Sequence, residues 1–253
     1  MTLHVDAFGP ENGPVVALLH GVPSPPHELV PLARAIAETG RRALVVHASG
    51  YGQSPRATSV GTAATRAQLV ETFRAHRAES LALVGFSGGA YRALDLACHG
   101  GLAITGVCCL AGMATLSDEG RRGMEQFAAG LDAGVDFHAI AAPRFLSPTW
   151  AAKPAAAAQI TAWLDATSPE NLARELRAFA VCPDLLPDLP QLECPILART
   201  GTLDLATPED NARAIIARAQ RGRLELVEGV GHALLIEDEP ATVASVLRFL
   251  VEV

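Results

Sequence analysis

The chain has 253 residues and a mass of 26.4 kDa, and 49% of its residues are hydrophobic. This is enough for one domain with a sizeable buried core. The formal net charge is −7 and the isoelectric point is near 5.6, which argues against nucleic acid or an anionic membrane surface as a main partner. No stretch approaches the roughly 18 uninterrupted apolar residues of a membrane span, and residues 1–9 lack the pattern of a signal peptide.

The five cysteines are odd in number and include no C-x-x-C pair, which is not the pattern of a disulfide framework. We expect buried thiols in a reducing cytoplasm, and therefore a cytoplasmic protein. No spacing joins the eight histidines to cysteine or acid clusters in the manner of a metal site. We expect neither a metal nor a cofactor.

Apolar runs and helical patterns alternate through the first 110 residues. Residues 3–8 and the turn at residues 9–14 indicate an opening β-hairpin. Further strands are expected at residues 15–19, 43–46, 81–84 and 104–110, and helices at residues 27–39, 62–77 and 90–98. Strands separated by helices favour parallel pairing, and reactive groups then gather beyond the carboxyl ends of the strands.

Residues 112–190 contain no convincing strand and favour several short helices. One of these helices should begin at Ser168, with Ser as the N-cap and Pro169 at the first helical position. Strands resume at residues 195–198 and 223–227, and helices follow each of them. We predict a core of residues 1–112 and 191–253, with a helical lid at residues 113–190 over the substrate pocket.

Residues 81–89 read Leu-Ala-Leu-Val-Gly-Phe-Ser-Gly-Gly and lead from a buried strand into a helix. A G-x-S-x-G sequence between a strand and a helix is typical of a nucleophile elbow, which holds its serine, here Ser87, in a strained turn. Side chains at positions 85 and 89 would collide where strand and helix nearly touch, which explains the glycines. The pentapeptide alone also fits a glycine-rich turn with a capping serine. The nucleophile elbow is therefore inferred from the strand before the pentapeptide and the helix after it.

A serine hydroxyl needs a base, and the base needs an acid that orients it. Asp204 follows the strand at residues 195–198, and His232 follows the strand at residues 223–227. Both therefore lie beyond carboxyl ends of strands, in the chain order Ser, Asp, His that suits this architecture. Asp118 is a rival acid after the strand at residues 104–110, but its surroundings resemble a helix N-terminus. We predict Ser87 as nucleophile, His232 as base and Asp204 as acid.

The reaction also needs two backbone N–H donors for the oxyanion. The elbow offers the N–H of Gly88, and the loop His20-Gly-Val-Pro23 offers that of Val22. Pro23 has no N–H and cannot be the donor. We expect His20 to brace this loop through a hydrogen bond rather than to react.

Together these residues resemble the α/β-hydrolase superfamily over nearly the whole chain. The matching segments are the loop at residues 20–23, the elbow at residues 85–89, the acid turn at residues 201–204 with Pro208, and Gly231-His232 with Glu237 and Pro240. The resemblance implies a mostly parallel eight-stranded sheet with helices on both faces and a lid inserted after the sixth strand. Residues 47–54 lack the Asp and Arg of the family's D-x-R-G-x-G-x-S, which puts the rigidity of that loop in question. Serine at position 87 disfavours relatives that use an aspartate nucleophile.

We expect a cofactor-free serine hydrolase that cleaves a small, mostly apolar ester, lactone or thioester through an acyl-enzyme. Two alternatives stay open. The same triad suits a C–C bond hydrolase or a perhydrolase. A lid residue that binds a substrate carboxylate would favour the C–C hydrolase, and Arg144, Arg174 and Arg177 are the lid arginines available, although each fits a solvated surface charge better. The fold also suits a ligand-binding receptor without turnover. A small-molecule substrate is the only partner we expect, and the oligomeric state is left open.

Overall fold

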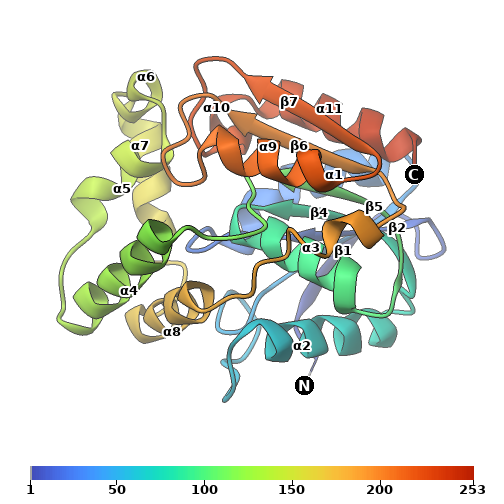
Figure 1. Cartoon of the computed structure of the whole chain (residues 1–253), viewed down its shortest axis with the longest axis horizontal. Helices are drawn as coiled ribbons and strands as arrows, with labels where there is room; N and C mark the ends of the chain where they lie inside the picture. The colour runs from blue at the N-terminus through green and yellow to red at the C-terminus, as the bar shows by residue number, and fades with distance from the viewer. Residues whose placement is uncertain (1) are drawn as a thin grey trace.

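Seven strands form the central sheet of the computed structural model, which describes residues 2–253 (Figure 1). The strands are β1 (Val5–Phe8), β2 (Val15–Leu19), β3 (Arg42–Val46), β4 (Ser80–Phe86), β5 (Ala103–Leu110), β6 (Ile196–Gly201) and β7 (Gly222–Val227). They lie in the order β1-β3-β2-β4-β5-β6-β7, and every pair is parallel except β1 with β3. This confirms the α/β-hydrolase fold that the sequence predicts.

Two details of the prediction are wrong. The described residues form seven strands rather than eight, so the helical insertion follows the fifth strand and not the sixth. The opening hairpin is also absent, because β1 pairs with β3 and not with β2. Since β2 has β3 on one side and β4 on the other, both of its edges are occupied and β1 takes the free edge of β3.

Helices cover both faces of the sheet (Figure 1). One face carries α1 (Val30–Glu38) and α11 (Glu239–Val251), and the other carries α2 (Thr62–Ala75), α3 (Gly88–His99) and α9 (Glu209–Arg218). In β2, Val16 and Leu18 pack into the core on the α1 side. Ala17 and Leu19 pack into the core on the α2 side. Both faces of the strand are therefore buried, which is why its sequence is an unbroken apolar run.

Five α-helices and no strand lie between β5 and β6, together at one end of the molecule (left in Figure 1), and the short 3-10 helix Leu189–Gln191 follows them before β6. They are α4 (Asp118–Asp132), α5 (His138–Phe145), α6 (Pro148–Ala151), α7 (Pro154–Trp163) and α8 (Pro169–Ala180). The predicted start of α8 is confirmed, because the Ser168 hydroxyl accepts a hydrogen bond from the Asn171 N–H at 3.2 Å. A last short helix, α10 (Leu234–Glu237), precedes α11. In the described part of the chain no helix combines the length and apolarity needed to cross a membrane.

The loop after β3 is braced around His47, which stands where the family pattern has Asp. The Nδ1 atom of His47 accepts a hydrogen bond from the Gln53 N–H at 3.1 Å, and its Nε2 atom lies 2.9 Å from an oxygen of Asp6. The Ser54 hydroxyl donates to the His47 carbonyl at 2.6 Å. The histidine thus occupies the centre of the loop and holds it to β1.

Helix α8 is attached to the same loop. The Thr167 hydroxyl donates to the Gly50 carbonyl at 2.7 Å, and the Arg174 guanidinium donates to the Ala57 carbonyl at 2.8 Å. Arg174 is therefore a bracing residue rather than a solvated surface charge. These contacts connect the helical segment to the carboxyl edge of the sheet.

Candidate active site

The chain turns sharply from β4 into α3 at Ser87. This residue has φ 53° and ψ −121°, a region that residues other than glycine rarely adopt. Two hydrogen bonds of 2.9 Å hold the turn, one from the Ser87 N–H to the Leu110 carbonyl and one from the Ala90 N–H to the Ser87 carbonyl. The neighbouring strand and the first turn of the helix therefore hold the strained backbone in place.

Glycines on either side of the turn are required by its close packing. A Cβ at Gly85 would lie within 2.5 Å of the Ala90 backbone, and a Cβ at Gly89 would overlap the Leu19 carbonyl oxygen. The sequence prediction that these two positions need glycine is confirmed.

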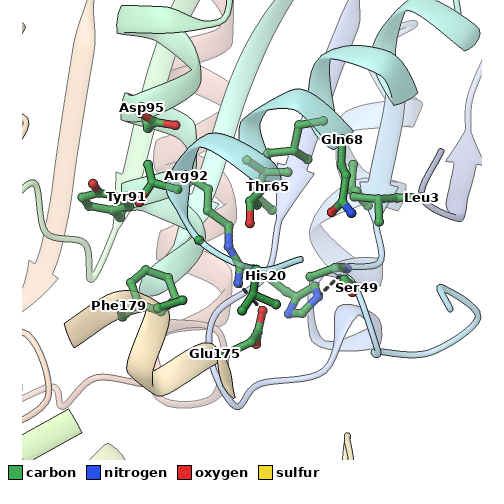
Figure 2. A pocket seen from close by; sticks show the side chains of 18 of the residues that line it. Leu3, His20, Ser49, Thr65, Gln68, Tyr91, Arg92, Asp95, Glu175 and Phe179 are labelled. Atoms are coloured by element: carbon green, nitrogen blue, oxygen red, sulfur yellow. Dashed lines mark hydrogen bonds and ion pairs between the residues drawn. The ribbon is translucent and has the colours of Figure 1, made fainter. Parts of the chain in front are cut away.

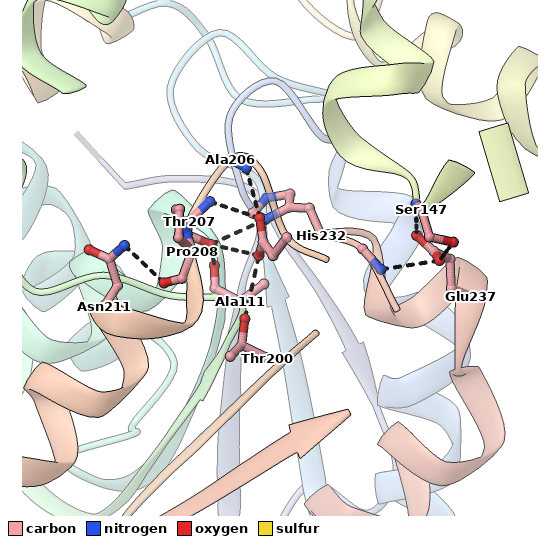
Figure 3. A network of polar contacts seen from close by, with 11 residues as sticks. Ala111, Ser147, Thr200, Ala206, Thr207, Pro208, Asn211, His232 and Glu237 are labelled. Carbon is pink, nitrogen blue, oxygen red and sulfur yellow. Dashed lines mark hydrogen bonds and ion pairs between the residues drawn. The ribbon is translucent and has the colours of Figure 1, made fainter. Parts of the chain in front are cut away.

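The structure brings Asp204 and His232 into contact. The His232 Nδ1 atom lies 2.8 Å from the Asp204 Oδ2 atom, and both side chains are almost fully buried. The other carboxylate oxygen, Oδ1, accepts hydrogen bonds of 2.8 Å from the N–H groups of Ala206 and Thr207 (Figure 3). The Thr207 hydroxyl lies 2.9 Å from Oδ2, a contact that the sequence analysis missed. The carboxylate is thus oriented from every side.

These contacts determine the charge of the pair. Burial, the largest influence, would raise the pKa of Asp204, but the charge and hydrogen bond of His232 and the hydrogen bonds from Thr207 outweigh it, so the pKa is lowered. The ionised carboxylate accepts a hydrogen bond from the Nδ1–H group of His232, so the imidazole keeps its free lone pair on Nε2.

The imidazole of His232 lies beside the elbow. Its ring centroid is 5.0 Å from that of Phe86, the residue before Ser87, and 5.5 Å from that of Phe145 on α5. Within the described residues no hydrogen bond joins His232 to the Ser87 hydroxyl. Such bonds are often long or poorly aligned before a substrate is bound.

The two predicted oxyanion donors also lie close together. A Cβ at Gly88 would be 3.5 Å from the Val22 side chain, and among the described residues neither N–H donates a hydrogen bond. His20 braces the Val22 loop as predicted: its Nε2 accepts from the Ala48 N–H at 3.0 Å and its Nδ1 donates to the Gly21 carbonyl at 2.8 Å. Burial is the main reason that the pKa of His20 falls to about 3, so the imidazole stays neutral.

The rival acid lies elsewhere. Asp118 is the exposed first residue of α4, and the Ser117 hydroxyl caps that helix by accepting from the Gly120 N–H at 3.1 Å. The helix-start interpretation of this segment is therefore confirmed, and Asp204 is the carboxylate in contact with the imidazole.

Glu237 connects the helical segment to the histidine loop, a role that the sequence did not reveal. Its carboxylate accepts from the Ser147 N–H at 2.9 Å and from the Ser147 hydroxyl at 2.5 Å, and also from the Gly231 N–H at 3.2 Å (Figure 3). One carboxylate therefore orients the chain before His232 and the start of α6 together.

The structure also assembles a histidine–carboxylate cluster that sequence spacing did not predict. Potential ligand atoms of His4, Asp6 and His47 lie within 4.8 Å of one another. Since Nδ1 of His47 accepts the Gln53 N–H, the proton of the neutral ring is on Nε2, the atom that faces Asp6. A metal bound there would need that atom unprotonated, so the cluster fits a hydrogen-bonded brace better than a metal site.

Substitution of the elbow glycine should disrupt folding. We expect Gly89→Ala to lower the melting temperature strongly, because the added methyl group overlaps the β2 backbone. Gly123→Ala in α4 is the matched control: it meets nothing within 4 Å and should stabilise the helix by up to about 1 kcal/mol. Equal melting temperatures for the two variants would contradict the close strand–helix contact.

The Asp204–His232 pair should make stability depend on pH. Because the folded pKa of Asp204 lies below its ordinary value of 3.8, its stabilisation is complete above that value and is lost as the pH falls through the folded pKa. We expect Asp204→Asn to reduce the free energy of unfolding by about 2 kcal/mol at neutral pH. The deficit should shrink in denaturant titrations below pH 3.8, whereas Asp118→Asn should show little deficit at any pH. A deficit that does not change with pH would argue against an ionised Asp204.

Comparison with known proteins agrees with this architecture. The chain is similar to a thermophilic esterase from Thermogutta terrifontis, with 21% identity, a TM-score of 0.88, and coverage of 99% of this chain and 93% of that one. It is similar to the enol-lactonase from Burkholderia xenovorans LB400, with 21% identity, a TM-score of 0.87, and coverage of 98% and 96%. An esterase from Exiguobacterium antarcticum matches with 19% identity, a TM-score of 0.84, and coverage of 98% and 94%.

At these identities the solved structures establish the fold alone. No curated protein matches the chain. The family model described as the alpha/beta hydrolase family matches residues 16–246, which is most of the sequence. The chain therefore belongs to the alpha/beta hydrolase family.

Proposed function

We propose that this hydrolase cleaves a small, mostly apolar ester, lactone or thioester through an acyl-enzyme on Ser87. The observation that carries the proposal is the buried Asp204–His232 hydrogen bond of 2.8 Å, beside a serine held in a strained turn. Structurally similar proteins named as esterases and as an enol-lactonase support the substrate class.

In the proposed reaction, Nε2 of His232 removes the hydroxyl proton as Ser87 attacks the substrate carbonyl. This step requires the Ser87 hydroxyl and Nε2 of His232 to come within hydrogen-bonding distance when the substrate is bound. The imidazolium then gives its proton to the leaving alcohol or thiol. His232 next takes a proton from water, which attacks the acyl-enzyme. The bond between the acyl carbon and the Ser87 oxygen then breaks, the imidazolium returns its proton to that oxygen, and the carboxylic acid is released. Asp204 stabilises the charged ring at both steps.

The N–H groups of Val22 and Gly88 would stabilise the oxyanion of each tetrahedral intermediate. Two features support this role: neither N–H has a partner within the described chain, and Gly88 is the first residue of α3. A helix N-terminus favours the negative charge that develops there. A donor of this kind contributes about 3 kcal/mol to the transition state.

The helical segment supports an apolar substrate. The rings of Phe86 and Phe145 pack beside His232, and Trp163 of α7 packs against both of these rings. We propose that residues 113–190 act as a lid on a core of residues 1–112 and 191–253. Among the described residues the buried Trp163 Nε1 has no hydrogen-bond partner, so this apolar wall retains one donor.

The test is Ser87→Ala assayed on p-nitrophenyl esters of short acids. We expect the turnover number to fall about a thousandfold or more, because the variant lacks the hydroxyl that forms the proposed acyl-enzyme. Ser80→Ala, an exposed serine at the other end of β4, should keep wild-type turnover. Equal turnover by wild type and Ser87→Ala would overturn the proposal.

The two alternatives give different outcomes in the same assay. A fluorophosphonate that labels Ser87 stoichiometrically, without multiple turnover on any ester, would indicate a ligand-binding receptor. Turnover of a diketone or of peroxide with a carboxylic acid, in the absence of ester turnover, would indicate a C–C hydrolase or perhydrolase.

A further inference from the structure

A cavity of about 50 Å³ lies between α2, α3, α8 and the loop after β3, apart from the Asp204–His232 pair (Figure 2). This is room for a few water-sized groups. Its wall is partly apolar, with Leu19 and Leu69 among its residues, and partly polar, with the hydroxyl of Thr65 and the amide of Gln68. Neither Ser87, Asp204 nor His232 lines it.

A buried ion pair forms one end of this cavity. Arg92 on α3 donates to an oxygen of Glu175 on α8 at 2.5 Å, and the two side chains are 10% and 9% exposed. The second carboxylate oxygen of Glu175 is buried and makes no hydrogen bond of normal geometry within the described residues. The buried Tyr51 hydroxyl, which also makes none, lies close enough to interact with this carboxylate. The Nε and Nη1 groups of Arg92 also make no hydrogen bond among the described residues. A buried carboxylate oxygen is normally paired, so Glu175 retains acceptor capacity. The N–H groups of Arg92 that do not bond Glu175 retain donor capacity.

The charges of the wall select against ions. A ligand carboxylate would face Glu175, and a ligand ammonium group would face Arg92. The remaining carboxylate of the wall, Asp95, is paired with Arg66 at 2.5 Å, and His20 is neutral. A neutral group with adjacent donor and acceptor atoms fits best. In a carboxamide, the N–H₂ can donate to Glu175 while the carbonyl accepts from Arg92.

The Phe179 side chain lies between the cavity and Gly88, whereas His20 of the oxyanion loop lines the cavity directly. The Phe179 ring lines the cavity, and its tip lies 2.9 Å from the position of a Cβ at Gly88. The same ring lies 5.4 Å from the Arg92 guanidinium. Displacement of this ring would join the cavity to the space above Ser87.

We propose that the Arg92–Glu175 end of this cavity binds a carboxamide-type group at the end of one arm of the substrate, with Phe179 as the partition between it and Ser87. The proposal rests on the proposed ester hydrolysis for its orientation toward Ser87. It assigns the substrate a neutral, hydrogen-bonding terminus in addition to the apolar part that packs near His232.

The test measures binding by calorimetry to Ser87→Ala, which keeps the site but cannot turn over. Two series of ligands are compared. The first series consists of methyl esters whose acyl chain ends in a carboxamide, in an isopropyl group of the same shape, or in a carboxylate. The second consists of acetate esters whose alcohol chain ends in one of these same three groups. In one of the two series, at the chain length that reaches the Arg92–Glu175 pair, the carboxamide ligand should bind about tenfold more tightly than the isopropyl or carboxylate ligand. Equal affinity of the carboxamide and isopropyl ligands in both series would overturn the proposal.

A volume-conserving variant sharpens the test. Glu175→Gln replaces the acceptor by a donor and removes the charge opposite Arg92, so the preference should change from carboxamide to carboxylate. Val181→Ala, at the exposed end of α8, is the control and should keep the carboxamide preference. If Glu175→Gln does not fold, the comparison of carboxamide and isopropyl ligands on Ser87→Ala still tests the proposal, because that comparison needs no substitution in the cavity.

A third measurement tests the connection to Ser87. A bound carboxamide ligand should slow fluorophosphonate labelling of the wild-type protein, whereas unchanged labelling at saturation would overturn the role of Phe179 as a partition. Failure of the proposed function looks different. In that case wild-type protein turns over no ester, while Ser87→Ala still distinguishes the carboxamide from its isosteres.

Discussion

The hydrogen bond between His232 and Asp204 is the interaction on which the account of this protein depends. It is buried, so the carboxylate keeps its charge only because an imidazole proton and two backbone N–H groups replace the water it loses. In return the carboxylate determines which imidazole nitrogen carries the proton. Without that constraint the ring could turn or change tautomer, and the loops around it would hold no base.

The parallel sheet brings these groups together. β4, β6 and β7 end at the same edge, so residues separated by more than a hundred positions in the chain meet beyond it. The helical segment is attached near this edge through a few polar contacts, among them the pair Arg92–Glu175 and the hydrogen bonds of Glu237. The Glu237 contacts hold this segment to the loop that carries His232.

Much of this arrangement was predictable from local patterns. The apolar runs indicate buried strands, the glycines at 85 and 89 indicate a close strand–helix contact, and the order of Ser87, Asp204 and His232 follows the strand ends. The number of strands and the pairing of β1 were not predictable in this way, because a short edge strand carries no signal for the partner it chooses.

Contacts between distant side chains were equally beyond the sequence. His47 replaces the expected loop residues through hydrogen bonds to Asp6 and Gln53, and Glu175 reaches Arg92 from another helix. Nothing in the spacing of these residues distinguishes them from surface charges, because the docking of α8 alone brings the last two together. The cavity beside them is a product of tertiary packing.

The most direct test of the central claim is a crystal structure of the protein after reaction with a fluorophosphonate. The account predicts a bond from phosphorus to the Ser87 hydroxyl oxygen, with the phosphoryl oxygen accepting from the N–H groups of Val22 and Gly88. Nε2 of His232 should lie within hydrogen-bonding distance of the adduct while Nδ1 remains bonded to Asp204. An adduct on another residue, or one whose phosphoryl oxygen points away from both N–H groups, would contradict the account.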